Sequence, residues 1–389
     1  MKHFLLAGIH PELTLAEAEA VLSIKIEQRM GPMLFVDQAG FDGAALQERL
    51  AGVVKLGDVL FEADLKDLEL KALAEQLADQ IDVRPRGERV LFGLTVIGSS
   101  NDIAPLKKLP IELKRTLQDR DRSVRWVTGD RGEISPAAVA KLKLTTEGYD
   151  FVIGVSGKKA VIGLTTHVQN ADAWSLRDYG RPFRDAKTGM LPPKLARLMI
   201  NLATHDGQEP TSLLDPFCGG GTVLMEAAML FPDAVLVGSD IDPIQVGGSK
   251  QNFVWLNQEG LVALSSEPKL IVAPVQNLGR EIQQTFDAIV TEGYLGEPLR
   301  GHEPRPFLMK NQENVEGVWE DALPVLANLL NKGGRLVCVW PEFVVGKEVV
   351  STDASAAAKR AGFRVLRSDL KYGRADQRVV RRVIVLEKA

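Results

Sequence analysis

Cysteine and histidine are scarce in this chain of 389 residues, which has two cysteines and five histidines. Two cysteines far apart in the sequence, Cys218 and Cys338, do not imply a disulfide framework. A reducing cytoplasm is therefore the expected compartment. The histidines are scattered without the spacing of metal ligands. We therefore expect no zinc or iron site and no metal at all.

Long apolar runs are also missing. Runs such as Phe151–Val155 fall far short of the roughly 20 residues that cross a bilayer, so we expect no membrane segment. The apolar stretch at the N-terminus is too short for the core of a signal peptide and predicts a first strand. With 45% hydrophobic and 25% charged residues, the composition is that of a globular protein, and the length favours two or three domains.

A large excess of positive charge is absent as well, since the formal net charge is −4. This excludes a protein that binds nucleic acid over its whole surface. The charge is uneven, however, because residues 105–145 contain ten basic and five acidic residues, a net charge of +5. Such a segment is typical of contact with a phosphate backbone at one face, but a solvated helix face with internal ion pairs explains it equally well.

Apolar periodicity divides the chain into α/β parts. Residues 1–60 predict a small unit with a helix from Thr14 to Leu22, where Thr14 and Glu17 have the spacing of a capping box. Residues 61–167 predict a second unit that ends in a hairpin, and residues 168–190, with Gly180, Pro182 and Gly189, predict a linker. In residues 191–389, strands alternate with helices, which favours a parallel sheet covered on both faces. The expected strands there are Leu213–Phe217, Ala234–Asp240, Leu270–Val275, Phe286–Glu292, Arg335–Trp340, Phe363–Leu370 and Val380–Leu386.

The segment Leu213–Thr222 is an apolar strand that ends in Asp215 and passes through three glycines into a helix. Ligands bind at this edge of a doubly wound sheet. The third glycine of a dinucleotide loop and the lysine of a phosphate loop are both absent. Asp215 would repel a pyrophosphate but suits a cation, and S-adenosylmethionine carries both an ammonium and a sulfonium group. The alternative is a tight turn without a ligand.

The next strand also ends in acidic residues, Asp240 and Asp242. A carboxylate at this strand tip can accept hydrogen bonds from both hydroxyls of a ribose, and we assign this role to Asp240. Asp242 has two open interpretations. It either shares in the ligand site or is the N-cap of a helix that begins at Pro243.

Asp215–Thr222 together with Gly238–Asp242 resembles the motifs of class I S-adenosylmethionine methyltransferases. The chain is also similar to one branch, the THUMP-domain tRNA guanine-N2 methyltransferases that act on the guanine at position 10. That similarity is carried by Phe92–Val96, Lys107-Lys108, Ser123–Arg125, Ala160–Thr166, Arg177–Asp185 and Gly189–Ala203.

The resemblance implies an α/β protein with three domains. These are a ferredoxin-like domain at 1–60, a THUMP domain at 61–167 that grips tRNA, and, after the linker, a Rossmann-like methyltransferase domain at 191–389 with a mixed seven-stranded sheet. RNA would be contacted by Lys107, Lys108 and Arg125. The expected residues for S-adenosylmethionine are Asp215, Pro216, Phe217, Cys218, Gly219, Gly221, Thr222, Asp240, Ile241, Gln276 and Asn277. Gln276 and Asn277 stand in for an acidic residue that the family usually has near the adenine.

The catalytic position departs from the family. At the end of the fourth strand the family has Asp-Pro-Pro-Tyr, whereas this chain has Glu292-Gly293-Tyr294. A guanine amine needs acceptors for its N–H protons, a ring to stack on and close placement to the methyl group. Glu292 and the Gly293 carbonyl could be the acceptors, and Tyr294 the stacking ring.

Three hypotheses follow. The first is a tRNA methyltransferase that places one or two methyl groups on a guanine N2. The second is an RNA-binding protein whose catalytic site is degenerate, and the third is a methyltransferase for another RNA base. Near the C-terminus, the segment Lys371–Arg374 is followed by Arg378, Arg381 and Arg382. These basic residues either face RNA from a final hairpin or guard an edge strand against pairing. Nothing in the sequence indicates the oligomeric state.

Overall fold

The computed structural model of the chain describes all residues except 82–88, 130–132, 186–189, 205–206, 264 and 375. Gly189 of the expected linker and Arg131 of the basic segment lie outside the described residues. The chain forms two compact units. Unit 1 comprises residues 1–15 and 25–173, and unit 2 comprises residues 16–24 and 174–389.

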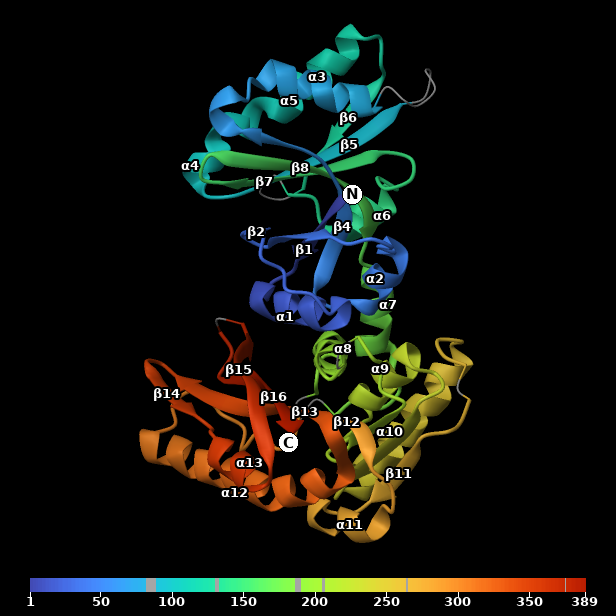
Figure 1. Cartoon of the computed structure of the whole chain (residues 1–389), viewed down its shortest axis with the longest axis vertical. Helices are drawn as coiled ribbons and strands as arrows, with labels where there is room; N and C mark the ends of the chain where they lie inside the picture. The colour runs from blue at the N-terminus through green and yellow to red at the C-terminus, as the bar shows by residue number, and fades with distance from the viewer. Residues whose placement is uncertain (82–88, 130–132, 186–189, 205–206, 264, 375) are drawn as a thin grey trace. The chain divides into compact units, whose positions relative to one another are not determined.

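Unit 1 is built on one eight-stranded sheet with the order β2-β3-β1-β4-β8-β7-β5-β6 (Figure 1). The strands are β1 (Lys2–Ala7), β2 (Arg29–Met30), β3 (Met33–Asp37), β4 (Val53–Asp64), β5 (Val90–Ile97), β6 (Val124–Val127), β7 (Tyr149–Ser156) and β8 (Lys159–Val168). The helices are α2 (Gly43–Arg49), α3 (Leu70–Ile81), α4 (Ser100–Ile103), α5 (Leu109–Asp119) and α6 (Pro136–Lys141), with the 3-10 helices η1 (Leu65–Asp67) and η2 (Ala104–Lys108). The sheet is continuous across the expected boundary at residue 60, because β4 spans it. The subdivision into two domains within unit 1 stays a prediction.

Helices α3 and α5 pack side by side over the sheet (Figure 1). Helix α5 buries Leu109, Leu113 and Leu117 at a spacing of four residues, so one face of the helix enters the core. The expected hairpin is present, with Ser156 opposite Lys159 and Gly157 in the left-handed region at φ +60°. This agrees with the turn preference for glycine.

The predicted capping box at Thr14 and Glu17 is wrong. Helix α1 (Pro11–Leu22) begins three residues earlier, at a proline, whose fixed φ suits the first position of a helix. The Thr14 hydroxyl donates to the His10 carbonyl instead of capping the helix. Glu17 is fully buried and accepts a hydrogen bond from Asn201 Nδ2 at 2.7 Å.

Unit 2 has a sheet of order β11-β10-β9-β12-β13-β16-β15, with β14 paired to β13 beside this path. Strands β9 to β13 of that path run parallel, and β16 is antiparallel to both of its neighbours. The strands are β9 (Ser212–Asp215), β10 (Val235–Asp240), β11 (Lys269–Val272), β12 (Phe286–Thr291), β13 (Leu330–Val345), β14 (Glu348–Ser351), β15 (Phe363–Tyr372) and β16 (Val379–Lys388). The prediction of a mixed sheet is confirmed; seven strands form its main path, and β14 adds an eighth strand that the sequence did not predict.

Helices cover both faces of this sheet (Figure 1). One group is α8 (Pro193–Leu202), α9 (Thr222–Leu230) and α10 (Pro243–Gln258), and the other is α11 (Leu278–Glu281), α12 (Arg305–Leu329) and α13 (Ser355–Arg360). The segment before α8 contains α7 (Ala171–Ser175), a π-helical turn η4 (Leu176–Gly180) and no strand among its described residues. A short 3-10 turn, η5 (Val275–Asn277), follows β11. Because β9, β10 and β12 are parallel neighbours, Asp215, Asp240 and Glu292 come to the same edge of the sheet.

Strand β15, which contains Lys371, is the edge strand of this sheet, so the guarding of an edge strand stays a prediction for Lys371 and is wrong for Arg381 and Arg382 of β16. Strand β16 lies inside the sheet between β13 and β15, and the two strands β15 and β16 form the expected hairpin. Arg381 is 7% exposed, and Arg382 donates to the carbonyls of Thr352 and Ser368. These two side chains are held by the protein itself, so the expectation of an RNA-facing basic edge is wrong for Arg381.

Candidate active site

The glycine loop of unit 2 is held to the neighbouring strand by backbone hydrogen bonds. The Cys218 amide donates to the Ser239 carbonyl at 2.8 Å, and the Gly221 amide donates to the Cys218 carbonyl at 2.8 Å. Gly219 and Gly221 have φ of +48° and +82°, a region where side chains are disfavoured. At Gly221 a Cβ would lie 2.3 Å from Ser249 Oγ. The loop therefore requires glycine and opens directly into α9.

Asp240 lies at the tip of β10, as predicted, and supports this loop. Its Oδ2 accepts the Gly219 amide at 2.9 Å, and its Oδ1 accepts the Asp242 amide at 3.0 Å. Each carboxylate oxygen has a second lone pair, so both remain able to accept hydroxyl protons. Asp242 accepts the Ile244 amide at 2.8 Å, so its expected role as the N-cap of α10 is confirmed.

Asp215 is buried, with 2% of its surface exposed. Burial raises the pKa of its carboxyl to about 7, and the nearby Asp240 and Glu292 carboxylates add to the rise. Asp215 Oδ1 accepts the Phe217 amide at 3.2 Å. A cation placed beside Asp215 would lower its pKa again, because an opposite charge favours the ionised form.

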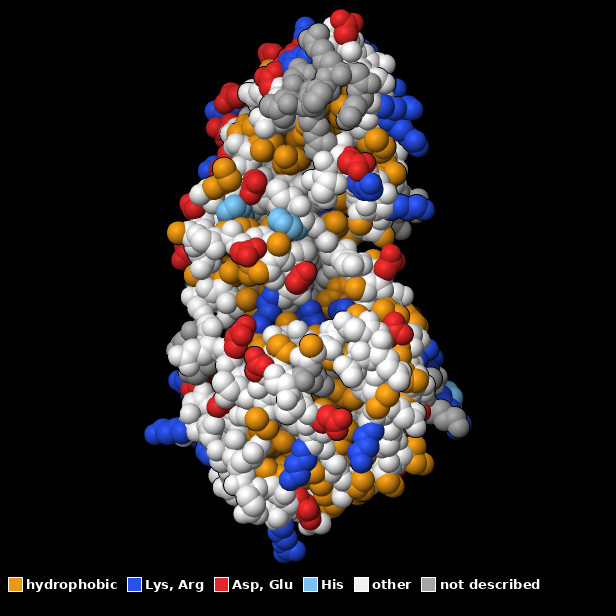
Figure 2. Space-filling model, turned by 90° about the vertical axis from the view of Figure 1, so that its right-hand side faces the viewer, with side chains coloured by type: hydrophobic (Ala, Val, Ile, Leu, Met, Phe, Trp, Pro, Cys, Tyr) orange, Lys and Arg blue, Asp and Glu red, His pale blue; other side chains and the backbone are white. Residues whose placement is uncertain are grey.

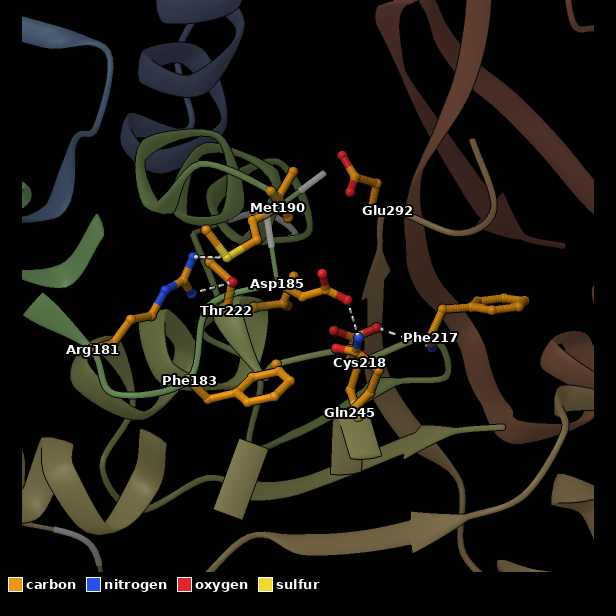
Figure 3. Close-up of a pocket in the computed structure, with 14 residues that line it drawn as sticks. Arg181, Phe183, Asp185, Met190, Phe217, Cys218, Thr222, Gln245 and Glu292 are labelled. Atoms are coloured by element: carbon orange, nitrogen blue, oxygen red, sulfur yellow. Dashed lines mark hydrogen bonds between the residues drawn. The ribbon is translucent and has the colours of Figure 1, made fainter. Parts of the chain in front are cut away.

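A pocket opens at this edge of the sheet and contains about 510 Å³ of empty space, including the part open to solvent (Figure 3). Six residues expected from the sequence line it, namely Asp215, Phe217, Cys218, Gly219, Thr222 and Glu292. The structure thus brings together the glycine loop and the carboxylate that follows β12. Pro216, Gly221 and Asp240 support the loop from behind, since Pro216 accepts a hydrogen bond from Ser239.

Arg181, Phe183 and Asp185, within the expected linker, also line the pocket, although no site residue is predicted in this segment. Asn252 of α10 is fully buried and joins this segment to the glycine loop. Its side chain accepts the Phe183 amide and donates to the carbonyls of Phe183 and Gly220. Gln245 donates to Asp185 at 2.8 Å. Dense aromatic and charged residues beside Gly180 and Pro182 are the sequence signal that could have indicated this role.

Glu292 lies at the end of β12, and its carboxylate is labelled at one side of the pocket (Figure 3). Its side chain is 14% exposed and forms an ion pair with Arg381 Nε of β16 through Oε1. Burial raises the pKa of Glu292, and the Arg381 guanidinium opposes this rise. Arg381 is thus a site residue whose role could not be assigned from the sequence.

The backbone after Glu292 differs from that of a proline-containing motif. Gly293 has φ +72°, and a Cβ there would lie 2.6 Å from the Trp319 ring. Proline is fixed near φ −65°, so it cannot occupy this conformation. Tyr294 follows with 38% of its surface exposed. The chain therefore has a left-handed glycine turn where the family has two prolines.

Gln276 and Asn277 are exposed on η5 and do not line the pocket. Gln276 donates to Asp321 of α12 at 3.4 Å. Ile241, directly after Asp240, is an exposed apolar residue with 70% of its surface accessible. The assignment of Gln276 and Asn277 to the adenine stays a prediction.

In unit 1, the basic segment 105–145 contains both internal ion pairs and exposed basic side chains. Arg115, Arg120 and Lys143 form ion pairs with neighbouring acidic residues. Lys107 and Lys108 on η2 and Arg125 on the edge strand β6 are exposed. Arg125 lies opposite Leu91, at the start of β5, whereas η2 follows the other end of that strand in the chain. Acidic and basic side chains are interspersed on the face drawn in Figure 2.

Two negative findings apply to the described part of the chain. It contains no helix long and apolar enough to span a membrane. It also contains no group of three or more histidine, cysteine, aspartate or glutamate side chains arranged to hold a metal ion.

The sheet order, the reversed β16 and the glycine loop after β9 define unit 2 as a Rossmann-like class I methyltransferase fold. Residues 181–370 match a family described as UPF0020, RMKL-like, methyltransferase domain. The solved structure of TrmN from Thermus thermophilus aligns over 100% of both chains, with a TM-score of 0.57 and 19% identity. Because the alignment covers the whole chain, the fold of unit 1 is similar to that of TrmN as well.

Two curated relatives are both called tRNA (guanine(10)-N2)-dimethyltransferase. The relative from Methanothermobacter thermautotrophicus is 28% identical over 203 residues, which cover 52% of this chain and 53% of that protein. The relative from Methanocaldococcus jannaschii is 36% identical over 168 residues, which cover 43% of this chain and 40% of that protein. The chain thus spans about half the length, or less, of these relatives.

Proposed function

We propose that this protein transfers a methyl group from S-adenosylmethionine to the exocyclic N2 of a guanine in tRNA, with position 10 as the expected target. The observation that carries the proposal is one pocket that joins the glycine loop to the Glu292 carboxylate. The names of the two relatives support the choice of substrate.

The donor side of the pocket fits S-adenosylmethionine on three observations. Asp240 keeps free acceptor capacity at the strand tip for the ribose hydroxyls, and the exposed Ile241 offers an apolar surface for the adenine. The buried Asp215 is suited to a neighbouring cation. The donor supplies an electrophilic methyl group when it is bound. The role of the chain is to hold donor and amine in line and to exclude water, since methyl transfer gains most from positioning.

The acceptor side of the pocket matches the hydrogen-bonding edge of guanine. Glu292 Oε1 is engaged by Arg381, which leaves Oε2 to accept from N1–H and N2–H of the base. Withdrawing the N2 protons toward an acceptor localises the amine lone pair for attack. The exposed Tyr294 ring can stack on a base that has been flipped out of the RNA. The left-handed turn at Gly293 aims these groups without the prolines of the family.

Unit 1 is proposed to grip the tRNA as a ferredoxin-like domain followed by a THUMP domain. Exposed basic side chains at Lys107, Lys108 and Arg125 support contact with phosphates. These contacts would fix the register of the RNA, while the pocket selects the base.

The test is transfer of labelled methyl from S-adenosylmethionine to unmodified tRNA, followed by mass spectrometry of the nucleosides. We expect N2-methylguanine, and we expect Glu292→Gln to lower kcat on the order of 100-fold because it removes a charged acceptor. Glu297→Gln is the control, since Glu297 is exposed in the same loop.

Donor binding without methyl transfer to any RNA would support the catalytically degenerate RNA-binding alternative instead. The departure at Gly293 is the observation that favours that second candidate. Labelling of a base other than guanine would indicate the third hypothesis, a methyltransferase for another RNA base.

A further inference from the structure

Helix α12 presents one buried polar side chain to the loop that follows β12. Asn311 is 2% exposed and lies on the same face of the helix as the buried Val315 and Trp319. Its Oδ1 accepts the Glu297 amide at 2.7 Å, and its Nδ2 donates to the Glu297 carbonyl at 3.1 Å. Both ends of the Asn311 amide are thus used on the backbone of one residue, which offsets the cost of burying this polar group.

Two glycines of this loop allow α12 to approach it closely. Gly296 has φ +84°, and a Cβ there would lie 2.5 Å from Asn311 Oδ1. Gly293 has φ +72°, and a Cβ there would lie 2.6 Å from Cζ2 of the buried Trp319. A side chain at either position would force the loop and the helix apart. The segment between these two contacts carries Tyr294, so this ring projects from a loop that is held at both ends.

Trp319 also contacts the glycine loop. The centroid of its ring lies 5.9 Å from that of Phe217, and the two ring planes are tilted by 59°. Tilted aromatic pairs at this distance add to the stability of the packing. Phe217 lines the pocket (Figure 3). One helix therefore sets the loop after β12 against the loop that carries the proposed donor site.

We propose that Asn311 is a positioning residue for methyl transfer, and that it acts together with the Trp319 contact. The two side chains hold the Gly293 carbonyl and the Tyr294 ring at the places that the amine and the base require. This inference rests on the proposed function. Neither Asn311 nor Trp319 lines the pocket, so both act through the loop. Proline restricts the backbone by its own ring, whereas glycine leaves the backbone free. A loop with glycines therefore needs support from outside, and α12 provides it here.

The test combines hydrogen exchange, methyl transfer to unmodified tRNA and titration with S-adenosylhomocysteine. In Asn311→Leu the side chain stays branched but cannot pair with the Glu297 backbone. We expect the amides of residues 293–297 to exchange about tenfold faster, as for the loss of one hydrogen bond. We expect kcat to fall about 10- to 100-fold, as for a misplaced group, while KM for tRNA and the affinity for S-adenosylhomocysteine stay within about twofold.

Asn314→Leu is the matched control. Asn314 is the same residue type on the same helix, and it forms no hydrogen bond with the loop after β12 among the described residues. Asn311→Asp is the conservative variant, because it keeps the oxygen that accepts the Glu297 amide. We expect its exchange rate and its kcat to lie between those of Asn311→Leu and the wild-type protein. If Asn311→Leu does not fold, Asn311→Asp takes its place in the comparison of exchange with kcat.

Faster exchange with an unchanged kcat in Asn311→Leu would overturn the positioning role, since the contact would then be structural only. Unchanged exchange would overturn it too, because the loop would keep its shape without Asn311. A loss of donor affinity as large as the loss of kcat would show general damage to the pocket and would also overturn it. In these three cases the proposed function stands, because the wild-type protein is active. If the wild-type protein transfers no methyl group to tRNA, the proposed function fails and the positioning role fails with it.

Discussion

The two loops that form the pocket are built in different ways. The loop after β9 is fixed by hydrogen bonds to β10 and has glycines at two left-handed positions, Gly219 and Gly221. The loop after β12 begins with Glu292, whose side chain is held by Arg381 from a strand 89 residues further along the chain. We call them the donor loop, residues 215–222, and the acceptor loop, residues 292–296.

The different construction of the two loops fits the different ligands that we propose for them. In the proposed reaction, the donor loop meets a ligand that is the same in every cycle, and a rigid backbone suits a fixed shape. The acceptor loop would orient one base, and a side-chain ion pair and left-handed glycines stand where the family has prolines. Variants in the two loops should therefore separate donor binding from methyl transfer.

The largest expected effect is in the acceptor loop. Gly293→Pro introduces the residue of the family motif at a position with φ +72°, which proline cannot adopt. The loop must move, and we expect kcat to fall at least about 100-fold, as for a misplacement near 1 Å. Binding of S-adenosylhomocysteine, measured by titration, should stay within about twofold. Near-normal kcat would mean that the turn does not aim the acceptor groups.

A smaller effect is expected in the donor loop. Gly221→Ala places a Cβ 2.3 Å from Ser249 Oγ at φ +82°, and the left-handed backbone alone costs about 1–2 kcal/mol. We expect the affinity for S-adenosylhomocysteine to fall about tenfold and the free energy of unfolding to fall with it.

Gly247→Ala is the control for this variant. Gly247 lies inside α10 and has no atom within 4 Å of the added carbon, so alanine should stabilise the helix by about 0.5–1 kcal/mol. Equal affinities in the two variants would contradict the requirement for glycine at position 221.

The pH dependence of kcat should reflect the pKa of Glu292 in the acceptor loop. Burial raises the pKa of Glu292, and the Arg381 guanidinium opposes this rise. The carboxylate of Asp215, at the end of the neighbouring strand β9, interacts with Glu292 through its charge. In Arg381→Met the pKa of Glu292 must rise further, so the carboxylate becomes protonated at a higher pH. Transfer needs the ionised form, and the acidic limb of kcat should move to higher pH.

A profile of kcat from pH 5 to 9 measures this shift, and Arg381→Lys should retain most of the wild-type profile. An unshifted limb in Arg381→Met would show that Glu292 does not act as the charged acceptor. The donor affinity of the same variant tests whether the effect is confined to the acceptor loop.

The same contrast explains what the sequence alone could predict. All seven strands of the main sheet path in unit 2 and the donor loop follow from local patterns, because glycine spacing and apolar runs act within a few residues. Strand β4 lies between β1 and β8 but does not follow from the apolar pattern, because its polar positions at Lys55, Asp58 and Glu62 interrupt the apolar run. Lys55 is buried there only because it pairs with Asp150, 95 residues away.

Site residues that act through distant partners could not be assigned in advance. Arg381 reaches Glu292 only after the hairpin of β15 and β16 enters the sheet, and Asn252 joins Phe183 to Gly220 across three segments. Conversely, Thr14 and Glu17 have the spacing of a cap but serve other contacts, since a proline earlier in the chain starts the helix. Spacing predicts local geometry, and tertiary contacts decide which polar groups are used.

The smallest expected effect lies outside both loops. Lys107→Ala with Lys108→Ala should weaken tRNA binding and lower the slope of log K against log salt by up to about two, and Arg125→Ala should lower it by about one. Because Arg125 pairs with the start of β5 and η2 follows its other end in the chain, the two sites share no described contact and their effects should be additive. Donor affinity should not change in either variant. Lys114→Ala on α5 is the control, since specific phosphate contacts at Lys107 and Lys108 would leave tRNA affinity unchanged in this variant. An equal loss of tRNA affinity in Lys114→Ala would indicate that a diffuse positive field binds the tRNA instead.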